Sequence, residues 1–340
     1  MSSDYSSYEN VLAIHDGNKA EAARSLGVPR MTFTDRLEAL RRISPVPQET
    51  GFTLPDLPEG DVPIEDTIAQ LERRFEKRNE LVQAKRWLPV QIKDDKPIGI
   101  LWFGDPHLDD NGCHWPKLRA DVDLCKNTPG LYGANIGDST NNWSGRLARL
   151  YAGQDTSKET ARELVRWFMF GAGVEWLIWL MGNHDAWGDG IAVLEEMGAK
   201  AVWMEDWEAQ FRLVFPNGRE ARVWAAHNFK GHSMWNNNHG NLRAAFMRAQ
   251  AHLYISGHTH NWGVDHKENP DRQHVYWLAN ARGYKFNDSY ANRGGFPEQQ
   301  NGASVVSIFD PGASSGAGFV TCFADAETAA DWLTWKRSKK

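Results

Sequence analysis

The sequence predicts an α/β domain that follows a small all-α domain at the N-terminus. Three observations support this prediction. Over residues 97–323, short apolar runs typical of β-strands alternate with helical segments. The first part of the chain instead has the pattern of three short helices. A proline-rich stretch lies between these two patterns, so we expect domains at residues 1–43, 44–96 and 97–340.

The N-terminal helices are predicted over residues 8–42 from their start and stop signals. Gly17 ends the first helix, because glycine commonly follows a helix C-terminus. Asn18 with Glu21 three residues later resembles a capping box and starts the second helix. Pro29 suits the first position of the third helix.

The segment from Gly17 to Leu37 resembles the helix-turn-helix of Fis-type DNA-binding proteins. The resemblance rests on the small residues Ala22 and Ala23, the turn at Gly27 and the spacing of the apolar residues. It implies that the third helix enters a major groove. The residues near bases or phosphates would then be Arg30, Thr32, Thr34 and Arg36.

The charge of this module is balanced, which leaves a second interpretation open. Residues 1–42 contain six Lys or Arg and six Asp or Glu. Attraction to phosphates dominates the affinity for DNA, and a neutral module has little of it. A helical protein-interaction or dimerisation cap is therefore the alternative, although we favour contact with DNA.

An extended linker and an amphipathic helix are predicted before the α/β domain. Prolines recur between residues 44 and 63, as expected for a segment with little core to bury. Ile64, Ile68, Leu71 and Phe75 then recur at helical spacing on a charged helix that reaches about Arg86. A solvated helix is the default interpretation. Pairing with a second copy in a homo-oligomer, packing on the α/β domain and binding to phosphates are the alternatives.

Five predicted strands each end in a polar motif. Their carboxyl ends form the ligand crevice in open α/β sheets, so the motifs are expected to converge. Asp, Asn and His are metal ligands, and a metal site is the natural interpretation. The motifs are Asp105-Pro106-His107, Gly137-Asp138, Gly182-Asn183-His184-Asp185, His227 and Gly257-His258-Thr259-His260.

The order and spacing of these motifs resemble the calcineurin-like metallophosphoesterase family over about residues 97–323. The resemblance implies a four-layer α/β/β/α sandwich, in which two mixed sheets pack together between helices. Further predicted helices and strands agree with this layout. The helices are 158–171, 191–197 and 242–250, and the strands are 275–279, 303–309 and 318–323.

The resemblance also implies a ligand set for two divalent ions. One ion would be held by Asp105, His107 and His260, the other by Asn183, His227 and His258, with Asp138 as the bridge. Mixed oxygen and imidazole donors suit Mn best, with Fe, Zn or Ni as alternatives, whereas Ca and Mg prefer oxygen alone.

The remaining motif residues are assigned to catalysis by the same resemblance. His184 would contact the phosphoryl oxygen or protonate the leaving oxygen, and Asp185 would orient it by accepting its other N–H. The implied reaction is in-line attack of a metal-bridging hydroxide on phosphorus. Considered alone, Asn183 is explained equally well as a turn residue and Asp138 as a helix cap. Five motifs in register make these separate explanations poor.

The composition argues against some classes of protein but does not indicate a function. The formal charge of −6 provides no global basic field for nucleic acid. The three cysteines contain no C-x-x-C pair, which suits a reducing cytoplasm. Cys113 is expected near the site but inert. The polar, acidic N-terminus is unlike a signal peptide, and no apolar run approaches the roughly 18 residues of a membrane span. We therefore expect a cytoplasmic protein.

Substrate class is predicted only in part. Protein phosphatases of this superfamily carry an arginine soon after Gly-Asp and a glutamate where Asp185 stands, so a protein phosphatase is disfavoured. Two loops, 228–240 and 284–295, are candidates to contact substrate, with an ordinary surface role as the alternative. Their phosphate-binding candidates are Lys230, His232, His239 and Arg293, and their stacking candidates are Trp235, Tyr284 and Tyr290.

The combined prediction is a two-metal phosphodiesterase that acts on nucleic acid, with the helix-turn-helix as a DNA tether. A phosphodiesterase or phosphatase for small nucleotides is the first alternative, with the N-terminal unit serving assembly. A DNA-binding regulator with a phosphoesterase-fold sensor domain is the second. The combination of domains resembles proteins of bacteriophage or prophage origin.

Overall fold

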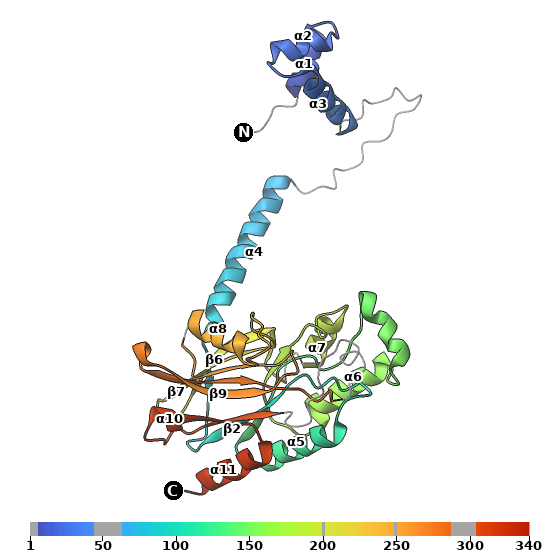
Figure 1. Cartoon of the computed structure of the whole chain (residues 1–340). Helices are drawn as coiled ribbons and strands as arrows, with labels where there is room; N and C mark the ends of the chain where they lie inside the picture. The colour runs from blue at the N-terminus through green and yellow to red at the C-terminus, as the bar shows by residue number, and fades with distance from the viewer. Residues whose placement is uncertain (1–5, 44–62, 199–200, 248–249, 287–303, 340) are drawn as a thin grey trace. The chain divides into compact units, whose positions relative to one another are not determined.

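The computed structural model describes five stretches of the chain, residues 6–43, 63–198, 201–247, 250–286 and 304–339 (Figure 1). The chain divides into two compact units, Met1–Ala69 and Gln70–Lys340. This division lies inside helix α4 (Ile64–Ala84). None of the helices within the described stretches is long and apolar enough to cross a membrane.

The N-terminal unit consists of three short helices, α1 (Ser6–Ile14), α2 (Lys19–Ser25) and α3 (Arg30–Ile43). They share a small core, in which alanine side chains allow the helices to approach closely. The core residues are Leu12, Ala22, Ala23, Phe33 and Leu37. The three predicted helices are confirmed.

The turns between these helices use the predicted residues. Asn18 caps α2 by accepting the backbone N–H groups of Ala20 and Glu21. Gly17 and Gly27 have φ of +81° and +66°, a conformation that glycine adopts without steric penalty. Both glycines therefore end a helix and turn the chain toward the next one.

The first of two six-stranded sheets contains strands β12-β11-β2-β3-β4-β5 in that order. Strands β2 to β5 run parallel, and β11 and β12 are antiparallel neighbours at one edge. In chain order the strands are β2 (Ile98–Phe103), β3 (Leu131–Asn135), β4 (Trp176–Met181), β5 (Met204–Asp206), β11 (Val305–Phe309) and β12 (Val320–Phe323).

The second six-stranded sheet has the order β1-β6-β7-β8-β10-β9 and is also mixed. Its central strands β7, β8 and β10 are parallel, whereas β6 pairs with β7 and β9 with β10 in antiparallel fashion. The strands are β1 (Leu88–Gln91), β6 (Glu208–Val214), β7 (Glu220–Ala226), β8 (Leu253–Ser256), β9 (Gly263–Asn269) and β10 (His274–Asn280). The predicted pair of mixed sheets is confirmed.

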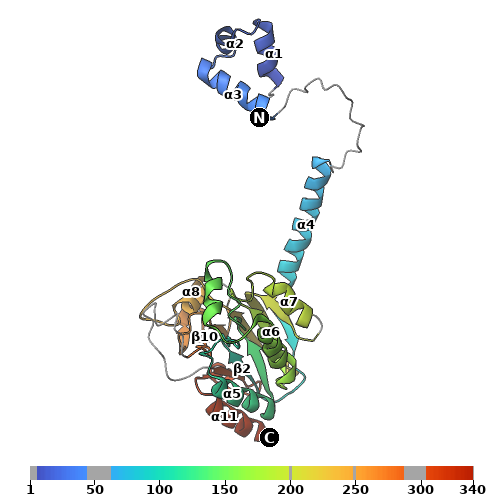
Figure 2. The same ribbon diagram turned by 90° about the vertical axis from the view of Figure 1, so that its right-hand side faces the viewer.

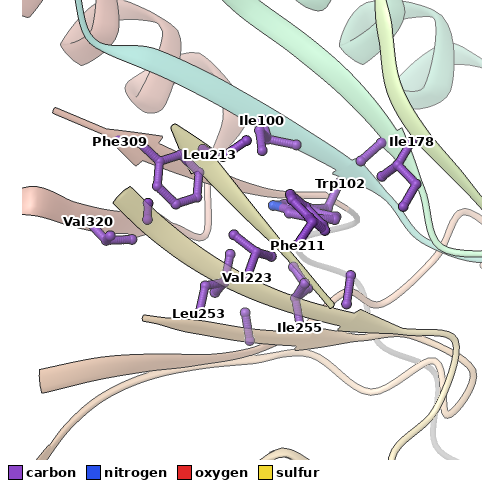
Figure 3. Close-up of a cluster of buried hydrophobic side chains, with 14 of the residues drawn as sticks. Ile100, Trp102, Ile178, Phe211, Leu213, Val223, Leu253, Ile255, Phe309 and Val320 are labelled. Atoms are coloured by element: carbon purple, nitrogen blue, oxygen red, sulfur yellow. The ribbon is translucent and has the colours of Figure 1, made fainter. Parts of the chain in front are cut away.

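The two sheets face each other across one large apolar core (Figure 3). Alternation along β2 shows how the sequence builds it, because successive side chains point to opposite faces. Ile98, Ile100 and Trp102 point toward the second sheet. Leu101 and Phe103 instead pack against the helices on the outer face of the first sheet. Strand β2 is thus buried on both sides and holds the start of the site rigidly.

Helices cover both outer faces. The first sheet is covered by α5 (Trp115–Asn127), α6 (Lys158–Arg166), α7 (Gly190–Gly198) and α11 (Ala326–Ser338), and α5 and α11 lie side by side (Figure 2). The second sheet is covered by α8 (His239–Met247). The order of layers is therefore helix, sheet, sheet, helix.

Two predicted elements differ in detail. The helix expected over 158–171 is α6 followed by a π-helical turn, η2 (Trp167–Gly171). The strand expected over 318–323 starts only at Val320, because Ser315 caps a short helical turn, α10 (Gly316–Phe319). Two short 3-10 helices, η1 (Gly145–Gly153) and η3 (Pro270–Arg272), complete the described elements.

Candidate metal centre

The five polar motifs lie at the carboxyl ends of five strands, three in the first sheet and two in the second. Strands β2, β3 and β4 are parallel neighbours, as are β7 and β8. Hydrogen bonds join the two sets of strand ends. His227 Nδ1 donates to the carbonyl of Ile136 at 2.9 Å, and the backbone N–H of His258 donates to Asp105 at 2.7 Å. The motifs therefore meet at one edge of the paired sheets.

Three overlapping groups of potential metal donors result. In each group the donor atoms lie within 4.8 Å of one another. Asn183 joins the third group, since its Oδ1 lies 3.0 Å from His227 Nε2. The groups are Asp105–His107–His260, His107–Asp138–His184 and Asp138–His227–His258. The structure thus brings every residue predicted as a metal ligand into one cluster.

Asp138 belongs to two of the three groups, and His107 joins the remaining group to them. One of its oxygens accepts the backbone N–H of His184 at 2.8 Å. The other oxygen lies 3.4 Å from His227 Nε2. This second oxygen therefore faces the imidazoles of His227 and His184, one from each of the two groups that share Asp138.

Two buried atoms of the cluster lack hydrogen bonds. Asp105 is fully buried, and its Oδ1 has no hydrogen-bond partner among the described residues. Nδ1 of His107 is in the same situation within that part of the chain. A buried polar atom without a partner is unfavourable. A cation that accepts both lone pairs would satisfy both atoms, so the donors fit a metal ion.

The tautomer of His227 gives a second indication of a cation. The carbonyl of Ile136 can only accept, so Nδ1 of His227 carries the proton. Nε2 then faces two further lone pairs, on Asn183 Oδ1 at 3.0 Å and on His258 Nδ1 at 3.1 Å. Converging lone pairs repel unless a proton or a cation lies between them.

The electrostatics of the cluster favour positive charge at this point. Burial, reinforced by the charge of Asp138, raises the pKa of Asp105 to about 8. Burial alone would raise the pKa of Asp138, but the imidazoles of His227 and His184 lower it. Burial would lower the pKa of His227, but the two carboxylates outweigh it and raise that pKa to about 9.

Many of the ligand positions have a backbone conformation that L-residues rarely adopt. Five of the ten non-glycine residues with positive φ in the described chain belong to the cluster. Such conformations are unfavourable and gather at functional sites, where the surrounding structure holds them. The φ values are 39° at Asp105, 41° at His107, 51° at Asp138, 65° at His258 and 52° at His260.

The glycines of the motifs allow the loops to approach the carboxylates. A Cβ atom on Gly182 would lie 2.3 Å from Asp138 Oδ1. A Cβ atom on Gly257 would lie 2.4 Å from Asp105 Oδ2. Gly137 has φ of +110°, and its Cβ would lie 2.6 Å from the backbone nitrogen of Gly182. A side chain at any of these positions would displace a ligand or its loop.

His184 lies at the edge of the cluster with one ring nitrogen anchored. Its Nδ1 donates to the backbone carbonyl of Asn141 at 2.5 Å, so Nε2 is the nitrogen left for the site. Nε2 lies 3.9 Å from Asp138 Oδ2. The rings of Trp143 and Trp187 flank the imidazole, with centroids 5.2 and 4.2 Å away. The imidazole is thereby fixed in both tautomer and orientation.

The role predicted for Asp185 is wrong. Its carboxylate does not accept the ring N–H of His184, because the Asn141 carbonyl occupies that place. Asp185 instead accepts the backbone N–H groups of Ser139 at 3.1 Å and Gly182 at 2.9 Å. Burial and the charge of Asp138 raise its pKa to about 7. Asp185 therefore joins the loops after β3 and β4 and acts on the site through the backbone.

Tyr284, a predicted stacking residue, is also placed differently. It is fully buried, and its hydroxyl donates to Asp121 at 2.7 Å. Its backbone N–H donates to the carbonyl of Asp105, which turns the side chain into the core behind the site. Tyr290 and Arg293 lie outside the described residues. The second candidate loop thus contributes no predicted contact within the described structure.

The other candidate loop forms part of a groove beside the cluster. The groove encloses about 490 Å³. Trp207 forms one wall, with its ring 5.1 Å from that of His227 and 37% of the residue exposed. Lys230 and Arg243 line the groove as exposed cations. His232 and Trp235 are exposed, and His239 starts helix α8 half-buried.

Some residues of the site were missed from the sequence. Lys285 is buried next to Trp143, which flanks His184, with Nζ 3.0 Å from Asp110 and 5.0 Å from the ring centroid of Trp143. Asn142 holds the loop of His184, because its amide donates to the carbonyls of His184 and Trp187. The doublet Asp109-Asp110 just after the first motif was the available signal for this second polar layer.

Cys113 is half-buried near the site and matches the expectation of an inert thiol. Its thiol donates to the carbonyl of Pro106 at 3.3 Å. Burial, with the charges of Asp110 and Asp109, raises its pKa to about 12. The thiolate required of a nucleophile is therefore strongly disfavoured.

The residues predicted to contact DNA lie on α3 but do not share one face. Arg30 is exposed at the start of the helix, Thr32 and Thr34 are half-buried, and the hydroxyl of Thr34 donates to the carbonyl of Arg30. Arg36 instead reaches α1, where its guanidinium donates to the Tyr8 hydroxyl at 2.6 Å. Arg30 is thus an exposed cation at the start of the helix, whereas Arg36 holds the unit together.

Comparison with known proteins identifies the N-terminal unit. Residues 9–40 match the family model described as "Bacterial regulatory protein, Fis family". The predicted Fis-type helix-turn-helix is therefore confirmed. No curated protein matches the chain in sequence.

Among solved structures, the chain is similar to "GAP50 the anchor in the inner membrane complex of Plasmodium". The identity is 9%, the match covers 72% of this chain and 96% of that chain, and the TM-score is 0.38. A likeness at this score carries no argument about function.

The first prediction concerns stability with metal. Mn²⁺ at 100 times its dissociation constant should raise the free energy of unfolding by about 2.7 kcal/mol, because the ion binds only the folded cluster. Asp138→Asn should abolish this gain. Asp123→Asn, which removes an exposed carboxylate on α5, should preserve it. Urea unfolding with Mn²⁺ or with chelator measures the effect. Equal midpoints in the wild type would contradict the metal site.

The second prediction concerns the close approach at Gly182. Gly182→Ala should lower the free energy of unfolding by about 1–3 kcal/mol, since the new methyl group meets the carboxylate of Asp138. Gly153→Ala is the matched control, because no atom lies within 4 Å of its Cβ position. Chemical unfolding of both variants measures the difference. Equal stabilities would show that the loops do not pack as described.

Proposed function

We propose that the chain is a metal-dependent phosphoesterase that hydrolyses phosphodiester bonds. The observation that carries this proposal is the convergence of five separate motifs into one donor cluster. A shared cap or turn explains none of these contacts across two sheets. The order of the motifs and the helix-sheet-sheet-helix layering together support a sandwich of the calcineurin-like metallophosphoesterase type.

The proposed donors are those of the three groups except His184, together with Asn183. Two divalent ions, preferably Mn²⁺, fit this mixed oxygen and nitrogen set, with Fe, Zn or Ni as alternatives. Asp138 is proposed as the bridge between the two ions, because it belongs both to the group with His107 and to the group with His227 and His258. When bound, such ions would supply Lewis-acid activation of water and of a phosphoryl group.

His184 is proposed as the proton donor to the leaving oxygen. Its Nδ1 proton is committed to the Asn141 carbonyl, so only Nε2 is free to exchange a proton at the site. The flanking rings of Trp143 and Trp187 restrict rotation of the imidazole and its access to water. A positioned acid of this kind accelerates turnover by about 10²–10⁴-fold.

Nucleic acid is the substrate class that two features favour. The Fis-type helix-turn-helix belongs to a family of regulatory proteins, and as a tether it would raise the local concentration of DNA at the site. The groove beside His227 combines the face of Trp207 with two cations, Lys230 and Arg243, and one carboxylate, Glu208. Aromatic faces stack on bases and cations hold phosphates, so the groove suits a single-stranded phosphodiester.

A phosphodiesterase for small nucleotides is the second candidate. The groove volume of about 490 Å³ supports it, because pockets for small molecules commonly measure about 300–1,000 Å³. In that case the helix-turn-helix would serve assembly or regulation. A DNA-binding regulator with a sensor domain would retain the donor cluster without needing an oriented His184.

The third prediction separates these candidates by substrate. With Mn²⁺, the protein should cleave bis-p-nitrophenyl phosphate and DNA faster than p-nitrophenyl phosphate. His184→Ala should slow cleavage by about 10²–10⁴-fold while metal binding is kept. His266→Ala, an exposed histidine on β9, is the control and should retain the rate. Activity on the monoester alone would contradict a phosphodiesterase, and no activity at all would favour the sensor.

The fourth prediction concerns the tether. Removal of residues 1–45 should lower the rate on long DNA and leave the rate on bis-p-nitrophenyl phosphate unchanged, because the metal centre lies entirely in the second unit. Steady-state kinetics on both substrates test this. Unchanged rates on both substrates would rule out the helix-turn-helix as a substrate tether.

A further inference from the structure

Helix α4 carries a row of large apolar side chains that are exposed to solvent. The helix extends from Ile64 to Ala84, and none of its residues is buried. Exposed apolar surface of this extent on a soluble chain marks an interaction site. The exposed fractions along this row are 63% at Ile64, 49% at Ile68, 55% at Leu71, 71% at Phe75 and 50% at Val82. Leu81, also 55% exposed, lies on α4 outside the row.

The width of the row identifies the kind of partner. At 100° per residue, these five positions fall within a stripe of about 60°. A helix that packs on a globular domain shows an apolar stripe of about 100° or more, whereas a narrow stripe is typical of a coiled-coil seam. The 4-3-4-7 spacing of the five residues is that of the a and d positions of a heptad.

We infer that α4 forms a parallel, two-stranded coiled coil with α4 of a second copy of the chain. The a positions are Ile68, Phe75 and Val82, and the d positions include Ile64 and Leu71. β-branched residues at a with leucine at d favour two parallel strands, and two of the three a positions are β-branched.

The flanking charges select the parallel orientation. In a parallel pair, Glu72 faces Thr67 of the second copy, and Arg74 faces its Asn79, so no like charges meet. An antiparallel pair that aligns Leu71 with Phe75 places Glu72 opposite Glu72 and Arg74 opposite Arg74. Like charges at flanking positions are destabilising, so the parallel pair is preferred.

Arg78 occupies the remaining d position and limits the strength of the pair. Its guanidinium has to turn away from the coiled-coil core toward solvent, so only its methylene groups fill part of the core at this position. A polar residue at one core position lowers stability while it fixes the register. We therefore expect an association that depends on protein concentration.

A parallel pair places both Ile64 ends at the same end of the coil. The two helix-turn-helix units then follow from one point through residues 44–63. Two modules held in this way bind two half-sites on one DNA molecule with a raised effective concentration. This arrangement does not depend on hydrolysis by the metal centre, so the two proposals fail or stand independently.

The fifth prediction is tested by sedimentation equilibrium of the full chain. The wild type should be a dimer that dissociates on dilution. Leu71→Glu should weaken dimerisation by on the order of 100-fold, and Arg78→Leu should tighten it by about 10-fold. Gln70→Glu adds the same charge outside the seam and should leave the dissociation constant unchanged. A tighter dimer in Arg78→Leu is a gain that misfolding does not produce.

Two results would overturn the inference. One is a monomer at all concentrations in both the wild type and Arg78→Leu. The other is a dimer whose dissociation constant is the same in Leu71→Glu as in the wild type, since association would then use another surface. Circular dichroism of each variant shows whether the helices are retained.

Orientation is tested by oxidative cross-linking. Ile64→Cys and Val82→Cys should each cross-link with itself in a parallel pair, because equal positions share a layer. In an antiparallel pair, only a mixture of the two variants should cross-link efficiently. The native thiols do not compete, since Cys125 and Cys322 are buried and burial raises the pKa of Cys113 to about 12. Cross-linking only in the mixture would overturn the parallel arrangement.

Discussion

A buried concentration of lone pairs and negative charge is the constraint on which the rest of the second unit depends. Asp105 and Asp138 lie at the edge of an apolar sandwich, where an ionised carboxylate without compensation is strongly unfavourable. The surrounding imidazoles compensate only in part, because Oδ1 of Asp105 lacks a hydrogen bond among the described residues. A bound cation would remove this imbalance. Binding of a metal ion would therefore also stabilise the folded state.

The donor residues are held in position mainly by the backbone conformation of their loops and by hydrogen bonds to backbone groups. Strained positive φ at the ligand positions persists because neighbouring contacts determine each loop. The carboxylate of Asp185 accepts hydrogen bonds from the loops after β3 and β4. The amide of Asn142 donates a hydrogen bond to the loop of His184. Gly182 removes the side chain that would separate those loops from Asp138. These contacts hold the donors in place before any ligand arrives, which is what a preorganised site requires.

The sequence was sufficient for the strands that carry motifs, because each couples an apolar run to a polar end. The sequence did not predict the partner of a side chain where that partner is a backbone group or lies far away along the chain. The partner of His184 is the Asn141 carbonyl, and a carbonyl leaves no trace in residue identity. Tyr284 was misassigned because its burial depends on the long-range contact with Asp121. The contact of Arg36 with Tyr8, on another helix, is likewise not visible in the local sequence pattern.

The balanced charge of the N-terminal unit gives a physical reason why two copies of the helix-turn-helix would bind DNA better than one. A single neutral helix-turn-helix gains little from phosphate contacts, so its affinity for DNA is low and it dissociates quickly. In the proposed dimer, joining two such modules through α4 would restore affinity by effective concentration rather than by added charge. On this argument the balanced charge of residues 1–42, which counts against DNA binding by a monomer, becomes compatible with it in a dimer.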